Sequence, residues 1–233
     1  MRIVIPSRKA ENVVPCVQSI LARDPAIPRS HIVVIDDGLD RRAHAALSGV
    51  TFLPGRKPFV FARNVNIGLT YALDDAIVLN DDTLLSSAGG FTSLDALAKC
   101  LGDDVGMIAP ACNLIGNPNQ RRHSAGRLRI ETLMLCFVAV YIPRTTQQAV
   151  GLLDETFIHY GFDDDDYSRR TLMANKTLYV WDGCFVDHSR LAPTFAAGAR
   201  NCDPETSNWP FFRDKYNLTM SSLEYCSRKP QTP

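Results

Sequence analysis

The sequence predicts an α/β fold in which helices flank a mostly parallel sheet. Over the first 80 residues, short runs of apolar and β-branched residues alternate with segments of helical periodicity. Two of these runs end directly in polar and acidic residues, at Asp36-Asp37-Gly38 and at Asn80-Asp81-Asp82. The chain has 233 residues and is 45% hydrophobic, so it can fill the core of one large domain. We therefore expect a sheet whose parallel strands end at a common ligand-binding edge.

The first half of the chain follows the alternation of strands and helices most clearly. A strand is expected at residues 2–6, and residues 11–23 carry apolar side chains at helical spacing before two prolines end the helix. The elements that follow are a strand at 30–35, a short helix at 41–48, a strand at 50–53, a helix at 61–73 and a strand at 76–79. This order predicts parallel strands joined by right-handed crossovers.

The second half of the chain is less regular. Its expected elements are strands at 105–109, 131–142, 177–181 and 184–188 and a helix at 166–174. A polar loop at 113–127 and a loop of aromatic and acidic residues at 155–166 lie between them. No repeat, low-complexity tract or linker divides the chain, so we expect a single domain over residues 1–233.

The charge and the hydropathy of the chain argue against two classes of protein. Lys plus Arg and Asp plus Glu both number 25, and a net charge of zero does not favour nucleic-acid binding driven by bulk charge. The best candidate for a membrane span, residues 133–142, has about half of the roughly 20 residues required, so we expect no transmembrane segment. Because Met1 is followed at once by a predicted strand, we also expect no signal peptide.

The seven cysteines predict neither a zinc ribbon nor a disulfide framework. Their number is odd, they are scattered, and no two of them form a Cys-x-x-Cys pair. Cys16, Cys100 and Cys136 stand among apolar residues and are expected to fill the core. This pattern is typical of a protein of the reducing cytoplasm.

Three acidic clusters mark the positions where chemistry is expected. Asp36-Asp37 and Asn80-Asp81-Asp82 follow strands, and residues 163–166 form the third cluster. Parallel strands bring the first two clusters to one edge, where close like charges repel unless a cation or a polar ligand compensates them. Oxygen ligands of this kind suit Mg²⁺ or Mn²⁺, which usually bind together with substrate phosphates. The alternative is an Asp-rich turn after each strand, since Asn and Asp favour turns.

Several other polar residues allow two interpretations each. His188 ends an apolar run, and it is either a structural side chain or a metal ligand. Arg63 and Asn64 either open a helix or contact a diphosphate, whose oxygens match the guanidinium group. Arg8 and Glu11 allow the same two interpretations. The carboxylates of residues 163–166 are a solvated turn, a charge cluster favoured by a helix dipole, or the source of a general base.

Seven segments follow one another between Ile3 and His188. They are Ile3-Val-Ile-Pro-Ser-Arg8, Val33-Val-Ile-Asp-Asp-Gly38, Phe61-Ala-Arg-Asn-Val-Asn-Ile-Gly68, Leu79-Asn-Asp-Asp-Thr83, Gly151-Leu-Leu-Asp-Glu-Thr-Phe157, Tyr160-Gly-Phe-Asp-Asp-Asp-Asp-Tyr-Ser-Arg-Arg170 and Val186-Asp-His188. In this order they resemble the motifs of family 2 of the inverting GT-A glycosyltransferases, especially its rhamnosyltransferase-like members. The resemblance implies the GT-A fold, a single Rossmann-like α/β domain.

The resemblance also implies an activity and a set of site residues. The activity is metal-dependent transfer of one hexosyl or deoxyhexosyl group from a nucleoside-diphosphate sugar to an acceptor hydroxyl, with inversion. Residues 1–110 would bind the nucleotide sugar, and residues 111–233 would face a glycan or glycoconjugate acceptor. Asp82 and His188 would hold Mn²⁺ or Mg²⁺, and Asp164 would be the catalytic base. The implied donor-binding residues are Pro6, Ser7, Arg8, Glu11, Asp36, Asp37, Arg63, Asn64, Asn80 and Asp81.

The sequence departs from the family pattern at two positions and leaves two rival functions open. Asn80 and Asp163 stand where the family has Asp and Glu, and the Gln-x-x-Arg-Trp motif of processive synthases is absent. This absence implies that one sugar is moved at a time. A nucleotidyltransferase is one rival, although residues 7–10 lack the glycine of a phosphate-binding loop. A catalytically inactive nucleotide-sugar-binding protein is the other, and Asn80 alone suggests it.

Overall fold

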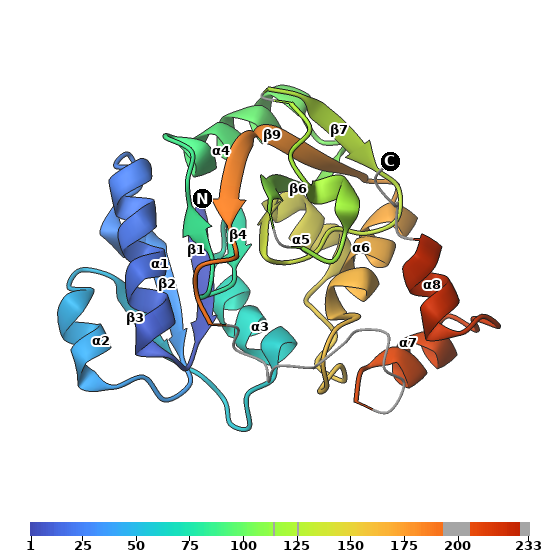
Figure 1. The fold of residues 1–233 in the computed structure, drawn as a ribbon, viewed down its shortest axis with the longest axis horizontal. Coiled ribbons are helices and arrows are strands. Elements are labelled where there is room, and N and C mark those ends of the chain that lie inside the picture. Colours follow the sequence, from blue (N-terminus) through green and yellow to red (C-terminus); the bar gives the residue numbers. More distant parts are fainter. Residues whose placement is uncertain (114, 125, 193–205, 229–233) are drawn as a thin grey trace.

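The computed structural model describes residues 1–113, 115–124, 126–192 and 206–228, in which nine strands form one sheet (Figure 1). The strands are β1 (Arg2–Ser7), β2 (Ile32–Asp36), β3 (Thr51–Pro54), β4 (Ala76–Leu79), β5 (Leu84–Leu85), β6 (Val105–Cys112), β7 (Leu128–Glu131), β8 (Ala139–Ile142) and β9 (Thr177–Asp187). The α-helices are α1 (Ala10–Arg23), α2 (Arg41–Ala46), α3 (Phe61–Ala72), α4 (Gly90–Leu101), α5 (Arg144–Val150), α6 (Asp163–Met173), α7 (Trp209–Lys215) and α8 (Ser222–Arg228). Two 3₁₀ turns, η1 (Arg29–His31) and η2 (Pro118–Gln120), complete the described elements.

The first four strands of the chain pair in parallel, as their alternation with helices predicted. The order across the sheet is β3-β2-β1-β4-β8-β6-β9-β5, with β7 beside β9. β8 is antiparallel to both β4 and β6, so β6 runs in the same direction as β4. β9 is parallel to β6 and therefore ends at the same edge as β1, β2 and β4. The expected α/β architecture is confirmed, and six strands end at its carboxyl edge, namely β1, β2, β3, β4, β6 and β9.

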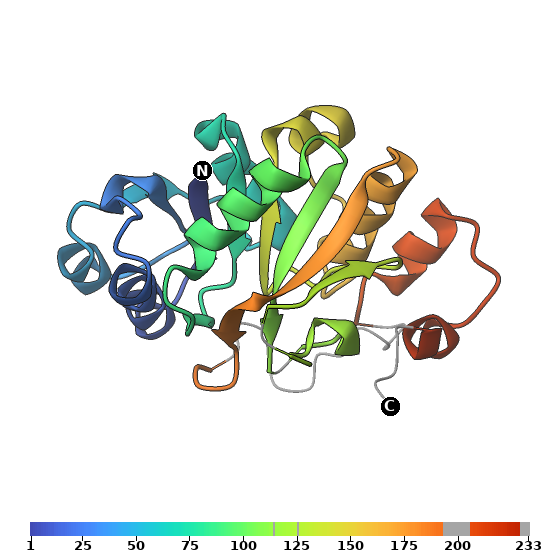
Figure 2. The same ribbon diagram turned by 90° about the horizontal axis from the view of Figure 1, so that it is seen from above.

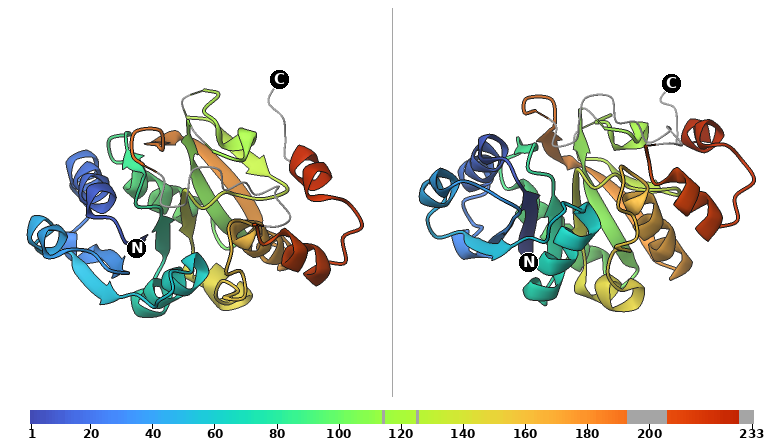
Figure 3. Two further views of the ribbon diagram at one scale, coloured as in Figure 1. Left: turned by 60° about the horizontal axis from the view of Figure 1, so that its bottom comes forward. Right: turned by 90° about the horizontal axis from the view of Figure 1, so that it is seen from below.

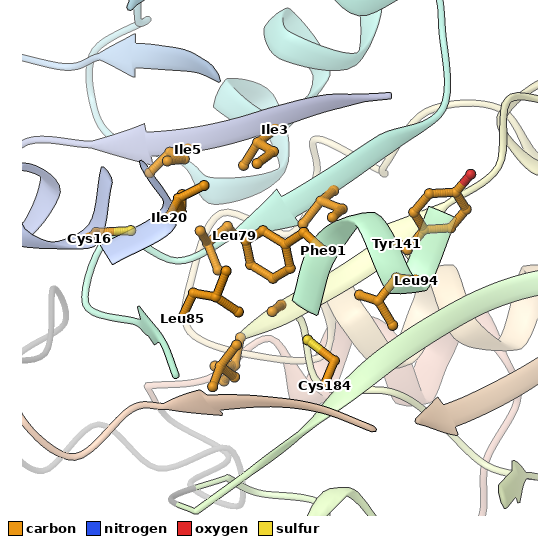
Figure 4. Close-up of a cluster of buried hydrophobic side chains, with 14 of the residues drawn as sticks. Ile3, Ile5, Cys16, Ile20, Leu79, Leu85, Phe91, Leu94, Tyr141 and Cys184 are labelled. Carbon is orange, nitrogen blue, oxygen red and sulfur yellow. The ribbon is translucent and has the colours of Figure 1, made fainter. Parts of the chain in front are cut away.

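Helices cover both faces of the sheet and bury its apolar side chains (Figure 2). On one face α1 and α4 pack against the sheet, where Phe91 of α4 lies near Leu79 of β4 (Figure 4). On the other face α3 and α6 pack against the sheet, and Tyr167 of α6 is fully buried there. Helix α3 approaches β1 closely, because a Cβ atom at Gly68 would lie 2.2 Å from a methyl carbon of Val4.

The last two helices lie beside α6, at the opposite end of the molecule from α1 and α2 (Figures 1 and 3). They contribute to a separate cluster of buried aromatic rings, namely Phe157, Phe162, Trp209, Phe212 and Tyr225. The start of α6 is therefore covered by a segment from late in the chain.

Three of the predicted strands, at 131–142, 177–181 and 184–188, are divided or joined differently in the structure. The apolar run at 131–142 is not one strand, because β7 ends at Glu131 and β8 begins only at Ala139. The runs at 177–181 and 184–188 belong to one strand, β9, which carries an irregularity against β6. Asp182 looked like a break, but its buried carboxylate pairs with Arg129 of β7 at 2.6 Å, so the strand continues through it.

Other elements were missed or displaced. We did not predict helix α4, although its buried residues Phe91, Leu94 and Ala98 stand at helical spacing, or the short helices α5, α7 and α8. The strands β5 and β7 were also not predicted. Helix α6 begins at Asp163 rather than at Asp166, so the third acidic cluster is a helical first turn and not a loop.

The cysteines correct one expectation. Cys226 is disulfide-bonded, although the scattered cysteines predicted no disulfide framework. Cys100 is exposed rather than a core residue, whereas Cys16 and Cys136 are buried as expected. Cys202 and the rest of residues 193–205 lie outside the described residues. No helix in the described part of the chain is long and apolar enough to cross a membrane.

Candidate active site

A cavity of about 390 Å³ lies at the carboxyl edge of the sheet. The residues that line it include Asn80, Asp81 and Asp82, which follow β4, and His188, which follows β9. Asp163 and Asp164 of α6 line it as well. The remaining lining residues are Pro6, Phe59, Phe61, Ile115, Gly116, Cys136, Phe137, Val138, His159, Tyr160 and Gly161. Two of the three acidic clusters predicted from the sequence thus meet in one cavity.

The strand side of the cavity is built by hydrogen bonds between neighbouring strands. Ser7, the last residue of β1, donates from its hydroxyl to the Asp81 carboxylate at 2.6 Å. β5 pairs with the end of β9 and places Leu84 opposite Asp187. The adjacent residue, His188, has its Nε2 3.0 Å from Oδ1 of Asp82. The structure thus brings together two residues that are 106 positions apart in the sequence.

The strand side carries concentrated negative charge. Asp81 and Asp82 are 2% and 5% exposed, and both lie near the buried Cys16 of α1. Burial raises the pKa of the Cys16 thiol, and the charges of Asp81 and Asp82 raise it further. Such a pair of buried carboxylates favours a cation at this place.

The residues present fit a divalent cation that a ligand helps to hold. Among the described residues, no three His, Cys, Asp or Glu side chains form a complete metal site. Asp82 and His188 supply one carboxylate and one imidazole, and the amide of Asn80 lines the same cavity. Mn²⁺ and Mg²⁺ accept such donors and commonly take their remaining ligands from phosphates and water. Asp82 and His188 would therefore hold an ion that binds with a diphosphate.

The helix side of the cavity presents Asp163 and Asp164 from the first turn of α6. Asp164 is 9% exposed, and one of its oxygens accepts a hydrogen bond from the backbone N–H of Asp165 at 3.0 Å. Burial raises the pKa of Asp163 to about 6, and the charges of Asp165 and Asp166 add to this effect. A carboxyl group with such a pKa exchanges protons near neutral pH.

The other two carboxylates of this turn face away from the cavity. Tyr225 of α8 donates from its hydroxyl to Asp165 at 3.1 Å. Asp166 accepts from Arg170 at 2.8 Å and from the hydroxyl of Tyr216 at 2.7 Å. Four identical side chains in a row therefore divide into two that line the cavity and two that anchor the helix.

Tyr160 lies where the two sides of the cavity approach each other. Burial raises the pKa of its phenol, and the charges of Asp164, Asp163 and Asp82 contribute to this increase. His159 and Gly161 line the cavity next to it. Sequence reasoning did not assign these three residues to the site, although Tyr160 belongs to one of the motifs.

The predicted donor residues at the end of β2 differ from each other. Asp37 is buried, and its Oδ2 accepts from the Asn64 amide at 3.4 Å. Its Oδ1 has no hydrogen-bond partner among the described residues, so this buried acceptor is available to a ligand. Asp36 instead uses Oδ1 to accept from the backbone N–H groups of Gly38 and Leu39 and Oδ2 to contact His44. The carboxylate of Asp36 thus stabilises the turn that follows β2.

The remaining predicted donor residues lie at different distances from the cavity. Pro6 lines it, and the guanidinium of Arg8 lies 5.4 Å from the ring centre of Phe59, which also lines it. Asn64 accepts from the backbone N–H of Arg56 and so holds the loop before α3. Arg63 does not line the cavity, and its Nε is 3.7 Å from a Glu155 oxygen. Glu11 is exposed on α1 and does not line the cavity either.

Comparison with known proteins supports the fold. No protein-family model and no curated protein matches the chain. The structure of GalNAc-T7 with UDP, GalNAc and Mn²⁺ matches with a TM-score of 0.68 and 14% identity, covering 93% of this chain and 47% of that one. The mannosyltransferase PcManGT from Pyrobaculum calidifontis, in complex with GDP-Man and Mn²⁺, matches with a TM-score of 0.62 and 17% identity, covering 100% of this chain and 65% of that one.

The chain thus spans about half to two thirds of the length of these structures. Both are glycosyltransferases, and their likeness to this chain extends over nearly all of it. At such low identity the likeness concerns the backbone only. The chain has the GT-A fold of these glycosyltransferases.

Proposed function

We propose that this protein is a metal-dependent glycosyltransferase that moves one sugar from a nucleoside-diphosphate sugar to an acceptor hydroxyl with inversion. The observation that carries the proposal is a single cavity lined by the Asp82–His188 pair and by Asp163 and Asp164. The fold neighbours were solved with UDP or GDP-Man and with Mn²⁺, which supports the same ligand class here. The order of the seven motifs supports membership of family 2, near its rhamnosyltransferase-like members.

Residues 1–110 form the donor-binding part in this proposal. The buried Oδ1 of Asp37, which has no hydrogen-bond partner among the described residues, would accept a hydrogen bond from the base or ribose of the nucleotide. Arg8 lies against the ring of Phe59, which lines the cavity, and its guanidinium would be the cation that contacts the diphosphate. Asp82 and His188 would hold Mn²⁺ or Mg²⁺, which neutralises charge on the departing diphosphate.

The second part of the chain, residues 111–233, faces the acceptor, which we propose to be a glycan or glycoconjugate. Asp164 takes the proton from the attacking hydroxyl as it bonds to the anomeric carbon. The nucleoside diphosphate leaves from the opposite face of the sugar in the same displacement. Inversion follows, and no covalent nucleophile is needed.

A donor screen tests this proposal. The melting temperature should rise in the presence of the correct UDP-, dTDP- or GDP-sugar with Mn²⁺, because a ligand that binds the native state stabilises it. The same sugar should be hydrolysed slowly or transferred to acceptors, and NMR of the product should reveal the inverted anomeric configuration. Absence of any nucleotide-sugar binding or turnover across the screen contradicts the proposal.

The same screen separates the two rival functions. A nucleotidyltransferase would release pyrophosphate from a nucleoside triphosphate and a sugar phosphate. An inactive binding protein would show the thermal shift without hydrolysis, and only Asn80 in the metal motif favours it. The joint presence of Asp82, Asp164 and His188 around one cavity favours an active transferase.

The location of the protein in the cell stays a prediction. The cytoplasm expected from the sequence is compatible with four buried cysteines that form no disulfide, namely Cys16, Cys112, Cys136 and Cys184. The disulfide at Cys226 counts against it, because disulfides rarely persist in a reducing compartment. Alkylation of free thiols in freshly lysed cells, followed by mass spectrometry, measures the redox state of Cys226 directly.

A further inference from the structure

The turn that leads into α6 has an unusual backbone. Gly161 and Phe162 both adopt positive φ, at 73° and 66°. The left-handed conformation is unfavourable for a bulky residue, and it persists only where the surroundings hold it in place. Asp163 and Asp164 follow directly, so this turn decides where their carboxylates lie.

Asn208 binds the backbone of this turn on three consecutive residues. Its side-chain amide donates to the carbonyl oxygens of His159 at 2.8 Å and of Gly161 at 2.7 Å. Its Oδ1 accepts from the N–H of His159 at 2.9 Å, and its own N–H donates to the carbonyl oxygen of Tyr160 at 3.1 Å. Asn208 is 2% exposed and does not line the cavity. Its amide group is thus used entirely to hold cavity-lining backbone.

The ring of Phe162 is held by the same late segment of the chain. Its centre lies 5.3 Å from the ring centres of Trp209 and Phe212 and 6.0 Å from that of Tyr225. The hydroxyl of Tyr225 also donates to Asp165, one residue beyond Asp164. Contacts from α7 and α8 therefore hold the ring of Phe162, whose backbone is strained. They also hold the outer side of α6 at Asp165.

We propose that Asn208 is a positioning residue, which holds the Gly161–Phe162 turn and thereby aims Asp163 and Asp164 into the cavity. The catalytic consequence rests on the proposed glycosyltransferase function, whereas the structural consequence does not. A base that is misplaced by about 1 Å can lose on the order of 10²-fold in rate. Asn208 does not line the cavity, and among the described residues its side chain bonds only to the backbone of His159 and Gly161. We therefore expect that donor binding does not depend on it.

The chain offers a matched control in Asn66. Asn66 is 4% exposed, and its amide donates to the carbonyl oxygen of Leu153 at 2.9 Å while its Oδ1 accepts from the N–H of the same residue at 2.9 Å. The amide also donates to Glu155 at 3.1 Å. Asn66 thus makes the same kind of contact as Asn208, but to a loop that does not line the cavity.

The test compares Asn208→Ala with Asn66→Ala in the full chain. Both variants should lower the melting temperature. Only Asn208→Ala should lower kcat for transfer, by about 10- to 100-fold, with the donor KM unchanged. Equal kcat in the two variants, or a kcat loss matched by a rise in donor KM, overturns the proposal. Should Asn208→Ala fail to fold, Asn208→Asp keeps the size of the side chain and the acceptor for the N–H of His159 but removes the two bonds that the amide donates. It should lower kcat without changing the donor KM, and an unchanged kcat overturns the proposal.

Hydrogen exchange separates this inference from the proposed function. The N–H of Asp166 bonds to the carbonyl oxygen of Phe162 at 2.9 Å, so its exchange rate reports on the turn. Asn208→Ala should speed exchange at Asp166, and Asn66→Ala should speed it only at Leu153. Unchanged exchange at Asp166 in Asn208→Ala overturns the positioning role. If the wild-type protein transfers no sugar, the proposed function fails and the exchange result still decides the role of Asn208.

Discussion

The strand side and the helix side of the cavity are built in different ways. On the strand side, Asp81, Asp82 and His188 follow strands of one sheet, and the register of β5 and β9 brings them together. On the helix side, Asp163 and Asp164 follow a strained turn that is held by residues from late in the chain. The strand side is thus part of the main sheet, whereas the helix side depends on contacts with α7 and α8.

This difference indicates how each side should respond to change. A substitution of Asp82 or His188 on the strand side removes a ligand of the metal ion. It leaves the sheet intact, because β4 and β9 each pair with a neighbouring strand on both sides. A substitution in the helix side, or in the segment that supports it, can move carboxylates without affecting the strand side. Substitutions on the strand side should therefore weaken donor and metal binding, whereas substitutions on the helix side should slow proton removal from the acceptor.

The largest effect is expected at Asp164. Asp164→Asn keeps the shape of the side chain but cannot accept a proton, so transfer should fall by about 10²- to 10⁴-fold. Donor and metal binding should remain normal, because Asp82 and His188 are unchanged. A transfer assay combined with a donor titration measures both quantities. Asp165→Asn is the comparison, since that carboxylate faces Tyr225 and not the cavity, and it should reduce transfer far less than Asp164→Asn.

Two results would contradict this prediction. If Asp163→Asn is inactive while Asp164→Asn transfers sugar, the base lies one position earlier than the motif implies. If both variants stay active, neither Asp163 nor Asp164 is the base, and the helix side of the cavity has no catalytic role of this kind.

The next effect concerns the strand side. Asp82→Ala and His188→Ala should each weaken Mn²⁺-dependent binding of the nucleoside diphosphate by about 10- to 100-fold, because each removes a ligand of the ion. Asn80→Asp should preserve or strengthen this binding, since it adds a charge. Calorimetry with Mn²⁺ and with EDTA measures the dependence. Equal affinity of the wild-type protein in both conditions would remove the metal from this site.

The strand side was largely predictable from the sequence, for a physical reason. The run Ala76–Leu79 is apolar and short, so it had to be a buried strand, and the residues that follow had to lie at its carboxyl end. Parallel pairing then predicted that Asp37 lies at the same edge, whereas Ser7 was assigned to the site through the resemblance. His188 could be placed only through the resemblance, because periodicity does not reveal which strands are neighbours.

The helix side could be predicted only in part. The composition of residues 163–166 indicated an acidic site, but four identical side chains contain no information about which of them face a cavity. That depends on the left-handed turn at Gly161 and Phe162 and on Asn208, which is 47 positions from Gly161. A single asparagine in a segment rich in Pro, Asn and aromatic residues has no pattern that predicts such contacts.

A smaller effect is expected among the donor residues, where the structure distinguishes Asp37 from Asp36. Asp37→Ala removes a buried acceptor whose Oδ1 is available to a ligand, so the donor KM should rise about 10-fold. Asp36→Ala should lower stability instead, because its carboxylate closes its own turn. Arg63→Ala should also change the donor KM less than Asp37→Ala, since Arg63 contacts Glu155. A larger KM increase for Asp36 than for Asp37 would reverse this assignment.

The smallest effect concerns the pH dependence of stability at Asp163. Burial raises the pKa of this carboxyl to about 6 in the folded protein, against about 4 in an unfolded chain. The folded state then binds the proton of Asp163 more tightly than the unfolded chain does. The contribution of this carboxyl to stability is therefore fully present below about pH 4 and is lost as the pH rises toward about 6. The difference corresponds to at most about 3 kcal/mol, and because solvent reaches part of the side chain we expect about 1 kcal/mol.

Urea unfolding of the wild-type protein and of Asp163→Asn at about pH 4.5 and about pH 7.5 measures this contribution. The amide does not titrate, so the variant should gain stability relative to the wild-type protein at the higher pH. Asp154 provides the opposite case, because the hydrogen bonds from Lys215 and Thr156 outweigh burial and lower its pKa to about 2. Asp154→Asn should therefore lose stability relative to the wild-type protein at both pH values. A variant of Asp163 that gains nothing between the two pH values would mean that this carboxyl is solvated and that its pKa is not raised in the folded protein.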